Sequence, residues 1–160
     1  MNLITFSITR KTVHERLFVT SANLVRVRES MGIPPEVCER LLITDDNKEL
    51  IAPLLEDSIS EIFTEIVRYH SNCTVGFFKD EKDKNEDYYI FNLRAPVNYP
   101  TSNQKKLEQR VQNFVNNRIL QSWYTNIKPD EASTFALNAQ NDIAVLQAML
   151  AQRSSPIEKL

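Results

Sequence analysis

His70 and Cys73 stand three residues apart, a spacing that places two side chains on one face of a helix. A cysteine beside a histidine can act as a nucleophile, and both residue types bind zinc. The other histidine and cysteine, His14 and Cys38, lie far from this pair in the sequence. Because a four-ligand site needs all four to converge, we expect no metal or cofactor here. We predict a surface histidine and a cysteine at the edge of the core.

A cluster of carboxylates follows Thr44 and consists of Asp45, Asp46 and Glu49. A threonine hydroxyl can accept a hydrogen bond from the first turn of a helix, and negative charge there complements the helix dipole. The apolar spacing beyond this point predicts a helix from Asp45 to about residue 70, with Pro53 inside its first turns. We therefore interpret these carboxylates as helix-capping groups and not as acid–base catalysts.

Basic residues form two short clusters, Arg10, Lys11 and Arg16 in one and Lys105, Lys106 and Arg110 in the other. Together with the aromatic residues Tyr88, Tyr89 and Trp123, they could form a surface that binds nucleic acid, because bases stack on aromatic rings beside basic side chains. The net charge of −2, however, provides no overall basic field. Trp123 falls on the apolar stripe of a predicted helix, so we predict that it belongs to the core.

Composition describes an ordinary globular chain of 160 residues, with 42% hydrophobic and 25% charged residues. We expect one domain over residues 1–153, followed by a polar tail at 154–160. Gly32 and Gly76 are the only glycines, which excludes a glycine-rich phosphate loop. We see no signal peptide, no membrane span and no disulfide spacing, and so expect a reduced protein made in the cytoplasm.

The spacing of apolar residues, together with the positions of capping residues, proline and glycine, predicts a mainly α fold with a small β component. Ile4, Phe6 and Ile8 alternate like a strand, and Thr12 to Glu15 resembles a capping box that opens a helix ending at Gly32. Further segments are predicted as helix 35–42, helix 45–70, strands 73–79 and 88–94, helix 103–124 and a last helix beginning at residue 129. The result is a small helical bundle with a short N-terminal strand and a projecting hairpin between the second and third major helices.

The core of this bundle is predicted from the apolar stripes of its helices. Aromatic and aliphatic residues of the last two helices should pack against the third, and they are Phe114, Ile119, Trp123, Ile143 and Leu146 against Ile59, Ile62 and Ile66.

The predicted hairpin ends in a long, charged tip, in which Asp83, Asn85 and Asp87 alternate as in a calcium loop. The tip lacks the glycine and the closing glutamate of that motif, so we interpret it as a solvated turn. Neighbouring residues of a strand point to opposite faces, so not all of the flanking aromatics can face inward. We therefore predict that the tip and its flanks contact another subunit, through Phe78, Asp80, Glu81, Lys82, Asp83, Lys84, Asn85, Glu86, Asp87 and Tyr88.

The order of these elements resembles that of the head-tail connector proteins of tailed phages, which form a ring beneath the portal. The acidic cap and leucine-rich helix resemble theirs over residues 41–55, and the segment from Phe114 to Trp123 and Tyr124 resembles their penultimate helix. Lys128 to Ala132 then opens a last helix, as in that family. The likeness extends over about residues 1–153 and is strongest to variants from phages and prophages of Bacteroidetes.

This resemblance implies a structural virion protein at the head-tail junction, with about a dozen copies in a ring. Its partners would be further copies of itself, the portal protein, and tail or neck proteins. DNA in transit would make only non-specific contacts with the lumen. The resemblance implies no enzymatic activity, no cofactor and no membrane partner.

Two alternatives from other classes stay open. The first is a small helical regulatory or nucleic-acid-binding domain, which would show salt-sensitive binding to duplex DNA. The second is a small enzyme that uses His70 and Cys73, which would lose an activity on point mutation while the fold stays intact.

Overall fold

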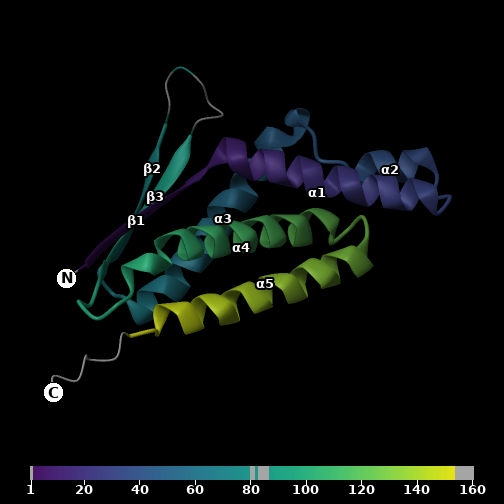
Figure 1. Cartoon of the computed structure of the whole chain (residues 1–160). Coiled ribbons are helices and arrows are strands. Elements are labelled where there is room, and N and C mark those ends of the chain that lie inside the picture. Colours follow the sequence, from purple (N-terminus) through teal and green to yellow (C-terminus); the bar gives the residue numbers. More distant parts are fainter. Residues whose placement is uncertain (1, 80–81, 83–86, 154–160) are drawn as a thin grey trace.

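The computed structural model describes residues 2–79, 82 and 87–153 of the chain (Figure 1). Its elements in chain order are β1 (Asn2–Thr9), α1 (Arg10–Ser30), α2 (Pro35–Leu41), η1 (Asp45–Asn47), α3 (Lys48–Tyr69), β2 (Cys73–Phe78), β3 (Tyr88–Ala95), η3 (Thr101–Asn103), α4 (Gln104–Tyr124) and α5 (Pro129–Leu150). The prediction of a mainly helical fold with a small β component is confirmed.

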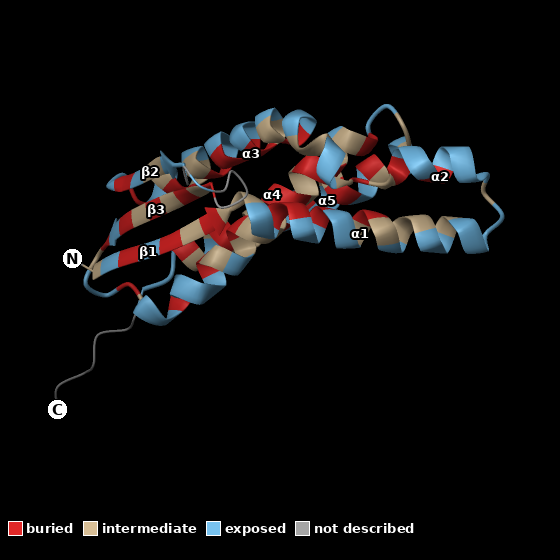
Figure 2. Cartoon of the chain, turned by 90° about the horizontal axis from the view of Figure 1, so that it is seen from above, coloured by how far each residue is buried: buried red, intermediate tan, exposed pale blue. Residues whose placement is uncertain are grey.

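The helices form two groups. α4 packs against both α3 and α5, and these three helices make the bundle that lies under the sheet (Figure 1). α1 and α2 pack against each other and extend away from the sheet as an antiparallel pair (Figures 1 and 2). We call α1 together with α2 the helical arm.

The three strands form one antiparallel sheet in the order β1-β3-β2. β2 and β3 pair as the predicted hairpin, with Cys73 opposite Leu93 and Phe78 opposite Tyr88. β1 pairs with the other side of β3, and this register brings Asn2 opposite Ala95. The sequence predicted the N-terminal strand but not its partner, which is 93 residues away.

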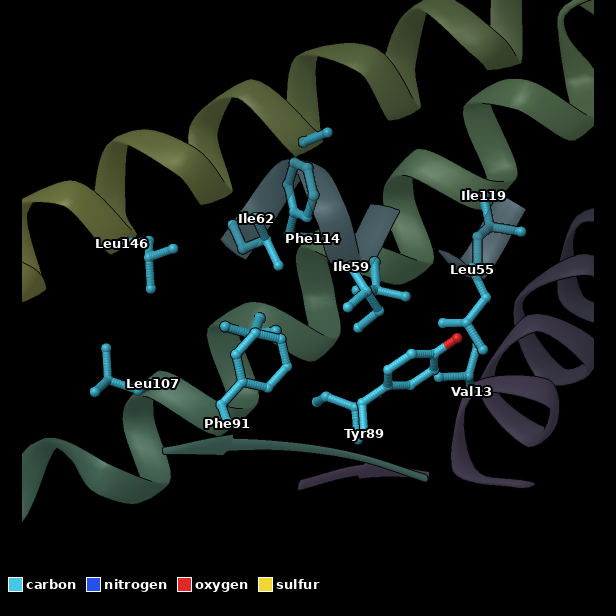
Figure 3. Packing of buried hydrophobic residues seen from close by; sticks show 14 of the residues in the cluster. Val13, Leu55, Ile59, Ile62, Tyr89, Phe91, Leu107, Phe114, Ile119 and Leu146 are labelled. Carbon is cyan, nitrogen blue, oxygen red and sulfur yellow. The ribbon is translucent and has the colours of Figure 1, made fainter. Parts of the chain in front are cut away.

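One face of the sheet is buried against the bundle. Ile4, Phe6 and Ile8 of β1 and Phe91 and Leu93 of β3 lie on this face. Figure 3 shows side chains of the sheet, α3, α4 and α5 pointing toward a common centre, with Phe91 below Ile62 and Phe114. Burial of this face stabilises the fold, because apolar area leaves water along the length of the sheet.

The start of α1 corrects the predicted capping box. Thr9, the last residue of β1, is the N-cap, and its hydroxyl oxygen accepts a hydrogen bond from the Thr12 amide at 3.2 Å. The helix therefore begins at Arg10, since the extended backbone of Thr9 already has the geometry of an N-cap. The predicted end at Gly32 is confirmed, because this glycine has a φ of +80°, a conformation that L-residues with side chains rarely adopt.

The start of α3 also differs from the prediction. Residues 45–47 form a separate 3-10 turn, and the α-helix begins at Lys48. The Asn47 side-chain oxygen accepts hydrogen bonds from the Thr44 amide at 2.8 Å and from the Thr44 hydroxyl at 3.2 Å, which closes the tighter turn. The Thr44 side chain in turn accepts from the backbone amide of Asn47, so the predicted N-cap at Thr44 is confirmed, at the start of a 3-10 turn and not of the α-helix.

The predicted core is confirmed in most positions. Phe114, Ile119, Leu146, Ile59, Ile62 and Ile66 are all buried in one cluster. Trp123 and Ile143 are half-buried at its margin. The fully buried aromatic at the end of α4 is the next residue, Tyr124, because one residue along a helix turns a side chain by about 100°.

Candidate functional site

His70 is buried, which corrects the prediction of a surface histidine. Its Nε2–H donates a hydrogen bond to the Leu150 carbonyl at 2.8 Å, and its ring lies edge-on to Tyr99 with centroids 5.1 Å apart. The sequence could not reveal this burial, because the end of α5 is 80 residues away. His70 therefore helps to fasten the end of α5 to the end of α3.

Cys73 is buried at the start of β2, as its predicted place at the core edge implied. Burial raises the pKa of its thiol to about 11, so the thiol stays protonated near neutral pH. Reactive cysteines have a lowered pKa and some exposure, and Cys73 has neither. Within the described part of the chain, no hydrogen bond joins Cys73 to His70.

The acidic residues that sequence analysis singled out do not form one site in the described part of the chain. Asp45 and Asp46 lie in the 3-10 turn, where Lys48 approaches Asp45 at 3.8 Å. Asp83 and Asn85 of the calcium-like pattern lie outside the described residues. Across residues 2–79, 82 and 87–153, no three side chains of His, Cys, Asp or Glu gather closely enough to hold a metal ion.

Each basic cluster has one arginine that forms an ion pair inside the molecule. Arg10 pairs with Asp87 at 3.2 Å, and Arg110 pairs with the buried Asp142 at 2.9 Å. Asn117 also donates a hydrogen bond to Asp142, at 2.7 Å. These two arginines join helices and strands to each other, so they contribute less to a basic surface than the sequence suggested.

The predicted interface falls only partly on described residues. Asp80, Glu81, Asp83, Lys84, Asn85 and Glu86 lie outside them. Asp87 is buried beside Arg10, and its carbonyl also accepts the Arg10 amide at 2.8 Å, so it fastens the hairpin to α1. Its predicted contact with another subunit stays a prediction. Phe78 is exposed and its ring stacks on that of Tyr88 with centroids 5.5 Å apart.

Phe78 and Tyr88 belong to a face of the sheet that the bundle does not cover. Register places Ile90 and Gly76 opposite each other on the same face, and Leu3 of β1 lies there with most of its side chain exposed. We call Leu3, Phe78, Tyr88 and Ile90 the outer-sheet surface. Phe77 and Tyr89 pair on the other face, with ring centroids 4.9 Å apart, so the predicted division of the four aromatics is confirmed.

The helical arm presents a second apolar surface, which sequence analysis missed. Three large apolar side chains are exposed near the tip of the arm, and they are Val27, Met31 and Val37. We call these residues the arm surface. Val27 and Met31 lie off the buried side of α1, on which Val13 and Leu17 lie. They were not recognised as an interaction surface.

The two surfaces lie at opposite ends of the molecule. In Figures 1 and 2 the strands occupy one end and the tip of the helical arm the other. Exposed patches of large apolar side chains commonly mark interaction sites. An elongated subunit with a different apolar patch at each end can bind copies of itself head to tail.

A pocket opens between the start of α1 and the 3-10 turn. Its lining includes Phe18, Lys11, Asp46 and His14, which is itself buried. The Nε2 atom of His14 is shielded from solvent and has no hydrogen-bond partner among the described residues. Burial, and then the charge of Lys48, lower the pKa of His14, so the neutral imidazole is the stable form at this position.

The free energy of unfolding is expected to fall as the pH drops below 6.5, the ordinary pKa of histidine. Burial lowers the pKa values of His14 and His70 in the folded chain. At a pH between the folded and the unfolded pKa values, the unfolded chain therefore binds more protons than the folded chain. Stability present at higher pH is therefore lost as the pH falls toward the folded pKa values. Urea unfolding at about pH 7 and about pH 5, for the original protein and for His14→Leu, measures this slope.

His14→Leu should weaken the pH dependence, because one of the two lowered histidines is gone. An unchanged slope would mean that His14 does not contribute, and that its imidazole is accessible to protons in the folded state.

The chain matches no family model, no curated protein and no solved structure. In the part of the chain that the structure describes, no helix is long and apolar enough to cross a membrane. The candidate functional site consists of the arm surface and the outer-sheet surface.

Proposed function

We propose that this protein is a structural subunit of a phage head-tail junction. Copies of it would form a ring that joins the portal to the tail or neck and passes DNA through its lumen. The observation that carries the proposal is the pair of exposed apolar surfaces at opposite ends of one elongated subunit. The resemblance in element order to connector proteins supports the same assignment.

A ring closes only if each subunit holds its two contact surfaces at a constant angle. The helical arm is fastened to α4 and to α5, and α1 is also bonded to the segment that follows α2, which favours such rigidity. The Tyr124 hydroxyl donates to the Leu41 carbonyl at 2.8 Å, and the Ile43 amide donates to the Ser21 hydroxyl at 3.0 Å. Arg28 of the arm forms an ion pair with Glu131 at the start of α5.

The charge of the chain suits a channel through which DNA slides. Tight binding to phosphates depends on a surface of free lysines and arginines. Here the net charge is −2, and Arg10 and Arg110 are engaged in internal ion pairs. A lumen built from such subunits would hold DNA weakly and without regard to sequence.

The proposal is tested by imaging the purified protein by negative-stain electron microscopy, alone and with the portal protein of its own phage. Closed rings, or a ring added to the portal, are the expected result. Particles that stay single subunits at high concentration and leave the portal unchanged would contradict it. If the same protein instead protects one DNA sequence at physiological salt, the regulatory alternative becomes the better explanation.

A further inference from the structure

β2 is an edge strand, and the register shows which of its backbone groups face outward. The Arg94 amide donates to the Asn72 carbonyl at 3.4 Å, and these two residues continue the β2–β3 register. In an antiparallel pair, residues that exchange hydrogen bonds alternate with residues that do not. Thr74, Gly76 and Phe78 therefore bond to β3. The amides and carbonyls of the alternate residues, Cys73, Val75 and Phe77, point away from the sheet.

The other edge of the sheet is partly occupied by the start of α4. The Arg10 amide donates to the Asp87 carbonyl at 2.8 Å, which fixes the same alternation for β1 and turns the backbone of Thr5 outward. The side chain of Gln104, the first residue of α4, donates to the Thr5 carbonyl at 2.5 Å. Among the described residues, no hydrogen bond occupies the outward groups of β2 in this way.

β2 also lacks the devices that usually protect an edge strand. Its sequence, CTVGFF, contains no charged residue and no proline. Natural proteins normally place lysine, proline or a bulge on an exposed edge, because unpaired backbone groups recruit another strand. Gly76 leaves no gap, since the Phe78 ring lies over it, 3.0 Å from the place where a Cβ would be. β2 is thus an unprotected edge strand, and its outward backbone groups can pair with another strand.

We infer that β2 pairs with β2 of a second copy, antiparallel and centred on Val75, and joins two three-stranded sheets into one. The outward groups recur at every second residue, so Cys73 of one copy meets Phe77 of the other and Val75 meets Val75. The two-fold axis places the central residue, Val75, beside its own copy, and a charged residue at this position would be repelled by the same charge. The uncharged β2 meets no such penalty, and this self-complementarity favours a second copy over a different chain.

This contact is separate from the proposed ring. A two-fold pairing uses the same surface on both copies, whereas a ring contact uses two different surfaces. The dimer predicted here can therefore form in a protein that makes no ring, and a ring can form without it.

The pairing is tested with the full-length protein by analytical ultracentrifugation over a concentration series, together with amide hydrogen exchange. We expect a monomer–dimer equilibrium. The amides of Val75 and Phe77 should be protected in the dimer and exchange quickly on dilution. The Gly76 amide, which bonds to β3, is the internal control and should be protected at both concentrations.

Val75→Pro removes the central outward amide and leaves the β2–β3 hydrogen bonds in place. It should raise the dimer dissociation constant by roughly tenfold or more, because both copies lose a central hydrogen bond. Val75→Ala keeps the amide and is the matched control, with the dimer retained. If Val75→Pro fails to fold, Thr74→Lys replaces it, since this exposed residue can carry an edge charge without touching the core.

Two outcomes of the ultracentrifugation and hydrogen-exchange experiment would overturn the inference. One is a protein that stays monomeric at high concentration with freely exchanging Val75 and Phe77 amides. The other is protection of these amides only after the portal protein is added, which would assign the edge to a different partner. A dimer that persists unchanged in both Val75→Pro and Thr74→Lys would likewise show that copies pair elsewhere.

Discussion

Replacing Tyr124 with alanine is expected to lower the free energy of unfolding by about 3–5 kcal/mol. The Tyr124 ring is fully buried and stacks on Phe135 with centroids 5.7 Å apart. Its hydroxyl donates to the Leu41 carbonyl, so the substitution also leaves a buried acceptor without a partner. Urea denaturation followed by far-UV circular dichroism measures the change.

Two neighbouring substitutions serve as controls for this prediction. Tyr124→Phe keeps the ring and should cost about 1–2 kcal/mol, the contribution of the lost hydrogen bond. Trp123→Ala removes a half-buried ring and should cost less than Tyr124→Ala. A larger loss for Trp123→Ala would show that α4 is rotated relative to the bundle, with Trp123 as the core residue.

Changing Val27 and Met31 together to glutamate is expected to abolish ring assembly while the subunit stays folded. These residues are 54% and 67% exposed. Val27 lies in the last turn of α1 and Met31 is its C-cap, so both lie at the tip of the helical arm. Carboxylates buried at a subunit contact lose their hydration without gaining a partner, and this cost is repeated at every contact of the ring. Electron microscopy counts the rings, and urea denaturation checks the fold.

The matched control for the arm variant is the pair Leu50→Glu and Leu137→Glu. These leucines are also exposed, but they lie on α3 and α5, outside both named surfaces. Rings should persist with this pair, and both double variants should unfold within about 0.5 kcal/mol of the original protein. Loss of rings in both would attribute the effect to added negative charge and not to the arm surface.

Local pattern determined most of the elements in this protein. The apolar stripes predicted the cores of α3, α4 and α5, and alternation at Ile4, Phe6 and Ile8 predicted β1. Pro35 and Pro129 each stand at the first turn of the helix that they were predicted to open. These features could be predicted from the sequence. Apolar periodicity, helix starts at proline and helix ends at glycine all depend on residues within a few positions of each other.

Tertiary structure decided what depends on distant partners. The pairing of β1 with β3, the burial of His70 by the end of α5, and the contact of Arg10 with Asp87 each join residues about 80 or more positions apart. The outward direction of the Val75 backbone likewise follows from which strand lies on each side of β2. The pattern around a residue specifies which face of its element is apolar. Which other element covers that face, and which edge stays open, is fixed only when the whole chain packs.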